Sequence, residues 1–342
     1  MLLFAHKNFL AIAMNYAHYL KEIGRGAEGA RHLSFDDARV LYGAMLDNEV
    51  PELELGAILL AFRVKGESID EMKGFLTALD ARLPILRAPV SRPRPIVLPS
   101  YNGSRRDPNL TPLLALLLRH HGIPVLIHGL LEGYGRVTTG QVFRALGILP
   151  CVTVTQVQVA LEEQGLAFAP LQVFSKGLAD LLALRGRMGV RNSGHSLAKM
   201  LDPFRGEGVL QAAATHPAFI DLSREVLMGR EARALLLRGT EGEPFANPKR
   251  RPRIEYIREG TSETLFEAEH DSLKSLPYLP EGADPDATAA WIREVLDGRM
   301  PVPLPIAHQL ACCLYASGAA GDFTQAKAIV AIDGNFSGPA RL

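Results

Sequence analysis

Apolar and polar residues alternate at helical spacing in the first quarter of the chain. Apolar side chains recur on one face between Val40 and Met45, and Ser34 followed by Asp37 is typical of a helix start. Polar residues interrupt the apolar stretch in residues 1–24 at helical intervals, so we interpret it as an amphipathic helix rather than a signal peptide. The chain therefore begins with helices.

Two further helices are predicted directly downstream. Pro51 stands at a helix start and Gly66 at its end, and Ser68 with Glu71 repeats the start signal before another apolar run. Short connections between such helices favour a compact bundle. Residues 1–83 are thus expected to form a small all-helical domain.

The pattern changes after a proline-rich stretch. Four prolines in residues 84–95 predict an extended linker, and from Ile96 short apolar runs that suit buried strands alternate with helical segments. This alternation predicts an α/β domain over residues 96–342, with a mainly parallel central sheet flanked by helices. The acidic stretch at 259–269 is expected to be rich in loops, and the C-terminal helices are placed at 286–297, 304–317 and 324–332.

Composition adds little to this picture. The 342 residues are 47% hydrophobic and 22% charged, which is ordinary for a folded protein. The longest apolar runs are too short to span a membrane, so we expect a cytoplasmic protein with no membrane partner. The cysteines have no metal or disulfide spacing and are expected to be packing residues in a reducing compartment: Cys151, Cys312 and Cys313.

The distribution of charge along the chain is more informative than the overall composition. The 37 basic and 37 acidic residues balance, yet basic residues dominate three segments, at 87–144, 176–205 and 244–258. Such separation can build a positive face on a neutral protein. The alternative is that each segment is a solvated surface whose acidic neighbours are supplied by the fold.

Several long stretches resemble a known family. They are "LSFDDARVLYGAMLDNEVPELELGAILLAFRVKGESIDEMKGFLTAL", "GIPVLIHG", "FRALGI", "LAFAP" and "RGRMGVRNSGHSLAKMLDP". Together they resemble the anthranilate phosphoribosyltransferases and the related pyrimidine nucleoside phosphorylases. The resemblance implies a helical domain that commonly forms the dimer contact, a larger α/β domain, and a site in the cleft between them.

The motifs that carry the chemistry of this family are altered. Its Gly-Thr-Gly-Gly-Asp loop, in which glycines let backbone N–H groups approach a pyrophosphate, is replaced by "PSYNGSRR" at 99–106. Its Lys-His-Gly-Asn becomes "IHGL" at 127–130, where the histidine is better interpreted as structural. The residues that a residual ligand cleft would use are Ser100, Asn102, Gly103, Asn109, Thr111, His128 and Gly129.

The metal-binding pair of the family is also missing. An adjacent Asp-Glu pair holds magnesium in family members, whereas "RGTEGEP" at 238–244 separates Glu241 from Glu243. We therefore predict no metal, no cofactor and no catalytic residues. Magnesium would be needed only if the chain were an active phosphoribosyl or glycosyl transferase with an altered substrate, which is the main alternative.

The altered loops themselves resemble an offshoot of the family, the prokaryotic nucleic-acid-binding proteins typified by YbiB. The segments are "KEIGRG", "PSYNGSRR", "NLTPLLALLLRHHGIPVLIHG" and "RGTEGEP". The resemblance implies a homodimer that binds DNA or RNA with little sequence preference. Tyr101, Phe245 and Tyr256 lie near the charges and could stack on bases, although each is more simply a packing residue.

Arginine side chains suit phosphate oxygens, and neutralising phosphates gives affinity without sequence readout. The candidate nucleic-acid-binding residues are Arg105, Arg106, Arg119, Arg185, Arg187, Arg191, Lys199, Lys249, Arg250, Arg251 and Arg253. Besides the transferase, a third hypothesis is a dimeric scaffold for another protein.

Overall fold

The computed structural model describes residues 15–26, 28–274 and 276–333. Four helices open the chain: α1 (Tyr16–Ile23), α2 (Phe35–Leu46), α3 (Glu52–Lys65) and α4 (Ile69–Asp80). The first 14 residues of the expected N-terminal helix lie outside the described residues. The capping signals are confirmed, because the Ser34 side chain accepts from the backbone N–H of Asp37 and Ser68 forms a complete capping box with Glu71.

A seven-stranded sheet forms the centre of the larger domain, in the order β3-β2-β1-β4-β5-β6-β7. Five strands are parallel: β1 (Ile96–Ser100), β2 (Val125–Gly129), β3 (Leu166–Pro170), β4 (Val209–Ala214) and β5 (Ala234–Arg238). The last two, β6 (Ile254–Arg258) and β7 (Thr261–Phe266), are antiparallel. The predicted α/β class, with a helical domain before a largely parallel sheet, is confirmed.

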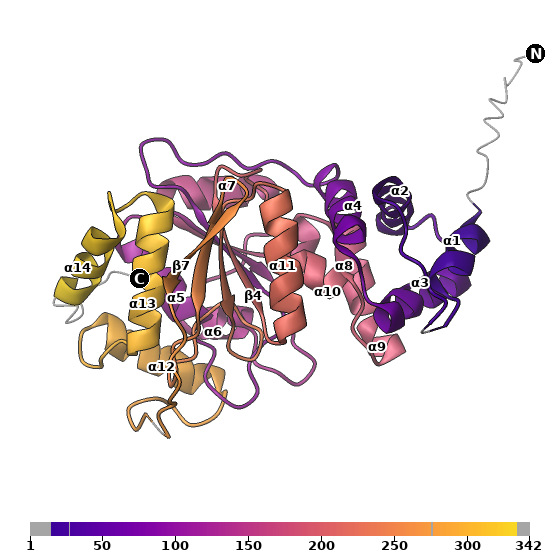
Figure 1. Cartoon of the computed structure of the whole chain (residues 1–342). Coiled ribbons are helices and arrows are strands. Elements are labelled where there is room, and N and C mark those ends of the chain that lie inside the picture. Colours follow the sequence, from indigo (N-terminus) through magenta and orange to yellow (C-terminus); the bar gives the residue numbers. More distant parts are fainter. Residues whose placement is uncertain (1–14, 27, 275, 334–342) are drawn as a thin grey trace, which may run out of the picture.

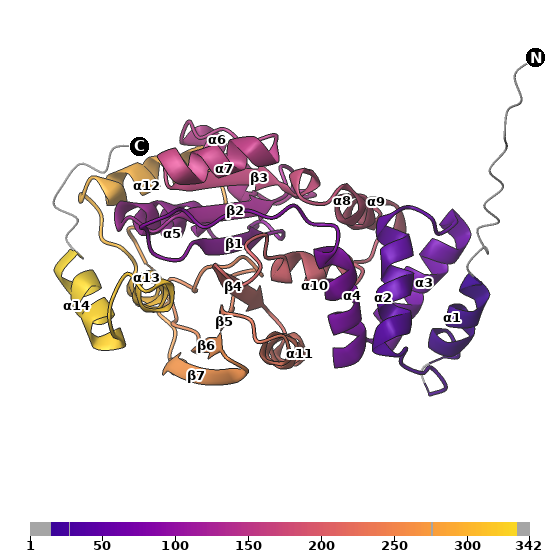
Figure 2. The same ribbon diagram turned by 90° about the horizontal axis from the view of Figure 1, so that it is seen from above.

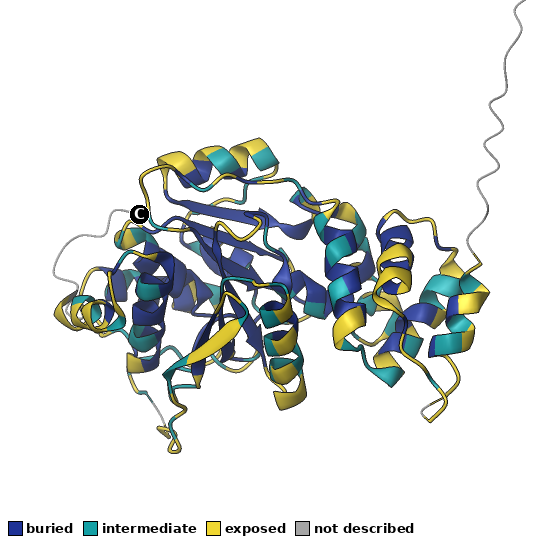
Figure 3. Ribbon diagram, turned by 45° about the horizontal axis from the view of Figure 1, so that its top comes forward, coloured by how far each residue is buried: buried dark blue, intermediate teal, exposed yellow. Residues whose placement is uncertain are grey.

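The hairpin of β6 and β7 departs from the expected loop at 259–269. Glu259 and Gly260 both adopt positive φ, which suits a tight turn between antiparallel strands. β7 is an edge strand whose residues are exposed or half-buried (Figure 3). Because one side of this strand needs no apolar residues, its polar sequence did not indicate a strand.

Helices cover both faces of the sheet (Figures 1 and 2). Ile96 and Leu98 of β1 point into one apolar core, whereas Val97 between them points into the other. The core that contains Ile96 and Leu98 includes residues of α5 (Thr111–His120), α6 (Thr139–Ala145), α12 (Pro285–Leu296) and α13 (Leu304–Ser317). Helix α14 (Phe323–Asp333) packs beside α13. The core that contains Val97 includes residues of α7 (Val154–Glu163) and α11 (Pro217–Gly229), and it is continuous with the core of the N-terminal helices.

The N-terminal helices do not stand alone in space. Three helices from the middle of the chain, α8 (Lys176–Ala183), α9 (Arg185–Met188) and α10 (Gly194–Leu197), lie between them and the sheet (Figure 2). α8 contacts α2, and both α10 and α11 contact α4. The predicted boundary at residues 84–95 therefore separates the two parts along the chain but not in space.

Short one-turn segments complete the fold, with 3-10 turns η1 (Leu171–Val173) and η2 (Ala198–Met200). Across the described ranges, no helix is long and apolar enough to cross a membrane.

Candidate functional site

The carboxyl ends of the parallel strands meet at one edge of the sheet, where sites in open α/β folds are usually found. The loop at 100–107 follows β1 at this edge, and the turn at 239–245 follows β5. Ser104 pairs with Val137, each backbone N–H donating to the other residue's carbonyl at 2.8 Å. This pairing fixes the loop at 100–107 against the segment that follows β2.

The carboxylate of Glu243 lies inside the loop that was compared with a phosphate cradle. It accepts the backbone N–H groups of Asn102 and Gly103, both at 2.7 Å, and the hydroxyl of Ser100. The hydroxyl of Thr111 also donates to it at 3.3 Å. Glu243 is fully buried, so this loop presents its donors to an internal carboxylate.

A second carboxylate, that of Glu241, holds the outer part of the same loop. It accepts the backbone N–H groups of Arg105, Arg106 and Asp107 at 3.0, 2.8 and 3.3 Å, and the guanidinium of Arg136 at 3.2 Å. Burial raises the pKa of Glu241, but these backbone hydrogen bonds and the charge of Arg136 outweigh it, so the pKa lies below its ordinary value. Glu241 is therefore ionised at neutral pH.

Glycine is required between the two glutamates. Gly242 has a φ of +90°, and a Cβ atom there would lie 1.6 Å from Nδ2 of Asn102. That amide in turn donates to the carbonyl of Glu241 at 2.9 Å. The Glu-Gly-Glu sequence thus fits a turn that presses against the loop at 100–107.

The residues of the predicted residual cleft are brought together, and all of them are buried. Asn109 bonds to the backbone of Thr111 and Val137, and the hydroxyl oxygens of Ser100 and Thr139 lie 2.8 Å apart, within hydrogen-bond distance. A Cβ atom on Gly129 would lie 2.0 Å from the carbonyl oxygen of Ser100, so the chain is already in close contact there. Ser100, Asn102, Gly103, Asn109, Thr111, His128 and Gly129 therefore contact one another or neighbouring backbone and leave little open cleft.

His128 is a structural residue by its geometry. Tyr101 donates its hydroxyl to Nδ1 at 2.6 Å, and Nε2 donates to the carbonyl of Leu201 at 3.1 Å. Burial lowers the pKa of His128 to about 3, which keeps the ring neutral. Tyr101, Phe245 and Tyr256 are also buried, so their rings are not accessible for stacking on bases.

Arg105 and Arg106 are the exposed basic residues of this loop. Within the described part of the chain, their guanidinium groups have no hydrogen bond or ion pair. Lys249 lies beside them, because its ammonium pairs with Asp107 at 3.0 Å. The first basic segment therefore offers two uncompensated charges at the carboxyl edge of the sheet.

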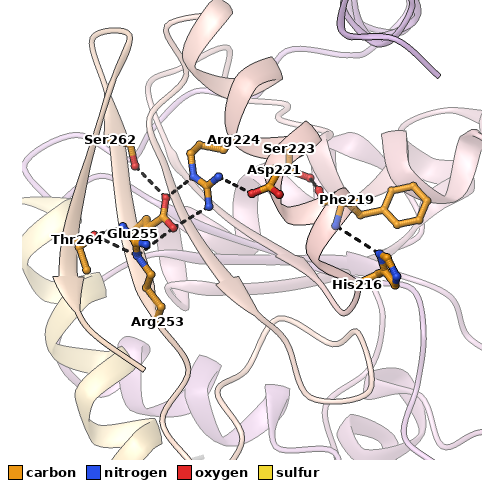
Figure 4. A network of polar contacts seen from close by, with 10 residues as sticks. His216, Phe219, Asp221, Ser223, Arg224, Arg253, Glu255, Ser262 and Thr264 are labelled. Atoms are coloured by element: carbon orange, nitrogen blue, oxygen red, sulfur yellow. Dashed lines mark hydrogen bonds and ion pairs between the residues drawn. The ribbon is translucent and has the colours of Figure 1, made fainter. Parts of the chain in front are cut away.

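The basic residues of the third segment are mostly engaged by the fold, three of them in ion pairs with acidic residues. Arg250 donates to the carbonyl of Glu269 at 2.8 Å, and Arg251 lies 3.6 Å from the carboxylate of the same residue and over the ring of Phe266. Arg253 pairs with Glu255, which Arg224 also binds (Figure 4). Here the acidic neighbours that we considered as the alternative are present.

The basic residues of the segment at 176–205 fall into two groups. Arg185 lies over the ring of Tyr134, and Arg187 pairs with Glu52 of α3 at 3.2 Å. Arg191 and Lys199 instead line a cavity beside α11, together with Arg63 of α3. Sequence reasoning did not single out Arg63, because only the tertiary structure brings α3 next to residues 191–199.

Lys199 connects the Glu-Gly-Glu turn with the end of β4. Its ammonium donates to the carbonyl of Gly242 at 2.9 Å and to that of Ala213 at 3.4 Å. Burial and the charge of Arg191 lower the pKa of Lys199 to about 8, although Glu243 opposes the shift.

Arg119 lies away from all of these residues. It is at the C-terminal end of α5, which precedes the amino end of β2, so it is at the opposite edge of the sheet. Metal ligands are also lacking: the described residues contain no group of three or more His, Cys, Asp or Glu side chains that could hold an ion.

Comparisons with known proteins agree with this architecture. The helical bundle domain of the glycosyl transferase family matches residues 17–82. The uncharacterized protein YbiB of Escherichia coli (strain K12) is 44% identical over 318 residues, which cover 93% of this chain and 99% of YbiB. Anthranilate phosphoribosyltransferase of Methylobacterium nodulans is 27% identical over 333 residues, 96% of each protein.

Solved structures show the same fold. Anthranilate phosphoribosyltransferase from Thermus thermophilus superposes with a TM-score of 0.71 at 23% identity, over 91% of this chain and 93% of that one. The Saccharomyces cerevisiae enzyme in complex with PRPP and Mg gives 0.69 at 15% identity, over 95% and 94%. By sequence and by fold, this chain belongs to the anthranilate phosphoribosyltransferase-type glycosyltransferase family, in the group that contains YbiB.

Proposed function

We propose that this chain binds nucleic acid with little sequence preference, as a homodimer that keeps the transferase fold without its phosphate cradle. One observation carries the proposal. Glu241 and Glu243 take the backbone N–H donors of the loop at 100–107, while Arg105 and Arg106 of that loop face outward unpaired among the described residues.

Electrostatic repulsion disfavours a lone diphosphate substrate in this loop. A diphosphate bound in that loop would have to displace two carboxylates from five backbone N–H groups. If the carboxylates stayed, the diphosphate would face their negative charge at close range in a region of low dielectric constant. Outward arginines instead suit phosphates that lie along the surface, as in a nucleic-acid backbone.

A dimer is supported by an apolar stripe on α3. Leu53, Leu60 and Val64 are 82%, 49% and 67% exposed and recur at helical spacing on one side of the helix. α3 lies near the outer end of the molecule (Figure 2), where a second copy can approach it. A contiguous apolar stripe of this kind marks an interaction surface.

Binding of the full chain to labelled single-stranded DNA, titrated against salt, tests the proposal. We expect affinity that falls steeply with salt and is indifferent to sequence, since released counterions supply most of the binding. Competition with 5-phosphoribosyl diphosphate plus magnesium tests the transferase alternative, which the named phosphoribosyltransferase relatives favour. Displacement of DNA by low concentrations of that competitor, or no DNA binding at all, would refute the proposal.

Two double variants locate the binding surface. R105A/R106A should weaken DNA binding roughly tenfold for unrelated sequences, because two unpaired phosphate-binding groups are lost. R250A/R251A removes the same charge from residues that the acidic stretch already engages, so we expect a much smaller effect. Equal losses in the two variants would mean that binding follows net charge rather than this loop.

A further inference from the structure

A cavity of about 320 Å³ lies between the N-terminal helices and the larger domain. Arg63 reaches it from α3, Arg191 and Lys199 from the segment around α10, and His216 from the turn between β4 and α11. Its size falls in the usual range for small-molecule sites, roughly 300 to 1,000 Å³. It is lined by a different set of residues from the loop at 100–107.

The charges that line this cavity are all positive. None of its lining residues is Asp or Glu. In the described part of the chain, the guanidinium groups of Arg63 and Arg191 have no hydrogen bond or ion pair. Burial and the neighbouring charges of Arg185, Arg136 and Arg63 lower the pKa of Arg191, and the charge of Glu243 opposes this shift without reversing it. Arg191 is half-buried, and a partly buried cation without a partner is costly, so an anion in the cavity would remove that cost.

Two histidines of the cavity add further donors. Nδ1 of His195 accepts the backbone N–H of Asn192 at 3.4 Å, and Nδ1 of His216 accepts that of Ala218 at 3.3 Å (Figure 4 shows the latter). A ring nitrogen that accepts carries no proton, so the proton of each ring is on Nε2. Both histidines line the cavity, so each ring can turn an N–H donor toward an anion there.

Lys199 also has an N–H group available for a ligand. Two of its three N–H groups go to the carbonyls of Gly242 and Ala213, which leaves one for the cavity. Donors thus approach from the α3 side, from residues 191–199 and from the β4–α11 turn. A tetrahedral oxyanion with several acceptor oxygens fits donors from several directions better than a planar carboxylate does. Met200, Phe219 and Leu222 add apolar wall for an organic group.

We propose that this cavity binds a small phosphorylated molecule, whose phosphate is held by Arg63, Arg191, Lys199 and the Nε2–H groups of His195 and His216. A phosphate monoester carries close to two negative charges at neutral pH and matches the surplus of cations. The site needs neither a metal ion nor the loop at 100–107. It is therefore a small-molecule site in addition to the proposed nucleic-acid surface, and it does not depend on that proposal.

Titration calorimetry of the full chain in the presence of a chelator tests the site, with inorganic phosphate and phenyl phosphate as probes. We expect one binding event per chain, tighter for phenyl phosphate because its ring adds apolar contact. R63Q/R191Q should lower the affinity at least about tenfold, since two charge-assisted contacts are lost. R105Q/R106Q, which removes the same charge outside the cavity, should leave the affinity unchanged.

Three results would overturn the proposal. They are no binding of either probe at millimolar concentration, equal losses in R63Q/R191Q and R105Q/R106Q, or displacement of phenyl phosphate by single-stranded DNA. The last would assign the cavity to the nucleic-acid surface. Circular dichroism checks that the variants fold. If the double variant does not, R63Q alone gives the test, because Arg63 is exposed and has no partner among the described residues.

Discussion

Two glutamates decide the chemistry of the carboxyl edge of the sheet. Glu243 is fully buried and is held by the Ser100 hydroxyl and by backbone N–H groups, and Glu241 binds three successive N–H groups of the loop that carries Arg105 and Arg106. These carboxylates occupy positions where an external anion would otherwise bind. They make the loop part of the protein's own structure and leave its arginines free for a partner.

The variant E241Q distinguishes a structural role for this glutamate from a simple charge effect. Removing one negative charge beside a basic loop should by Coulomb's law strengthen DNA binding. We expect the opposite, a loss of roughly threefold to tenfold, because a neutral amide accepts backbone N–H groups less strongly and frees the loop. DNA affinity measured at fixed salt decides, with E267Q as a matched control on a glutamate outside the loop. Stronger binding by E241Q would show that the carboxylate only repels.

Acid sensitivity follows from a buried ring. The folded-state pKa of His128 is about 3, below its ordinary value of 6.5, so between these limits the unfolded chain binds a proton that the folded chain excludes. The free energy of unfolding should therefore be greatest above pH 6.5. It should fall with decreasing pH, by up to about 1.4 kcal/mol per unit for this proton. His195, whose pKa burial and Arg191 also lower to about 3, acts in the same direction.

Urea denaturation between pH 7.5 and 5 checks this, because carboxylates contribute little in that window. H128Q keeps a donor and an acceptor in the side chain but cannot be protonated. Its stability should decline less steeply with falling pH than that of the wild type. Identical slopes for the two proteins would contradict the assignment.

At the scale of elements, tight turns place these side chains. The turn after β5 adopts positive φ at both Glu241 and Gly242 and packs against Asn102 so closely that no side chain fits at Gly242. The turn between β6 and β7 likewise sets the edge hairpin beside Glu269, whose carboxylate pairs with Arg251 and whose carbonyl accepts from Arg250. Turn geometry thus determines which basic residues stay available.

G242A tests the first of these turns. A methyl group would overlap Nδ2 of Asn102, and φ of +90° is strained for alanine, so we expect at least about 2 kcal/mol of lost stability. The free energy of unfolding from urea titration measures the loss. Gly147 also has positive φ but an open Cβ position, and G147A therefore serves as the control for backbone strain alone. A G242A variant no less stable than G147A would mean that the close contact is unimportant.

At the scale of the whole molecule, polar ties hold the N-terminal helices against the sheet. Asp80 of α4 pairs with Arg230 at the end of α11, and Glu67 accepts the hydroxyl of Ser193 at 2.5 Å. Together with the shared apolar core, these ties position Arg63 over the cavity and leave the apolar stripe of α3 exposed. One side of α3 therefore serves the proposed phosphate site and another the proposed dimer.

The dimer can be tested by placing charge in the stripe. L60E/V64E should convert a dimer into a monomer, because two carboxylates on each copy would be buried against apolar surface. Light scattering coupled to size exclusion gives the mass. V159E, on the exposed face of α7, is the matched control and should leave the mass unchanged. A wild-type chain that is monomeric at micromolar concentration would exclude the dimer.

Loss of the dimer should also weaken DNA binding. Two basic loops on one particle can engage one strand together, which raises the apparent affinity without a new contact. Comparison of L60E/V64E with the wild type on short and long oligonucleotides would show this as a loss confined to the longer ones.

Local signals in the sequence determined the elements. Ser68 and Glu71 predicted a capping box that forms, and the alternation of apolar runs with helical segments from Ile96 predicted the parallel sheet. Such features are readable because the interacting groups lie within a few residues of one another. The loss of the glycine loop and of the paired carboxylates was also visible from the residues alone.

Tertiary structure alone decided how the charges are used. The backbone N–H groups of Asn102 and Arg105 meet Glu243 and Glu241 although these residues are far apart in the sequence, and Arg63 lines the same cavity as Arg191 only because the fold brings α3 near residues 191–199. The edge strand β7 was missed because its exposed face has no apolar pattern. Whether a charge is paired, buried or free depends on distances between remote segments, and a linear sequence contains those distances only through the fold.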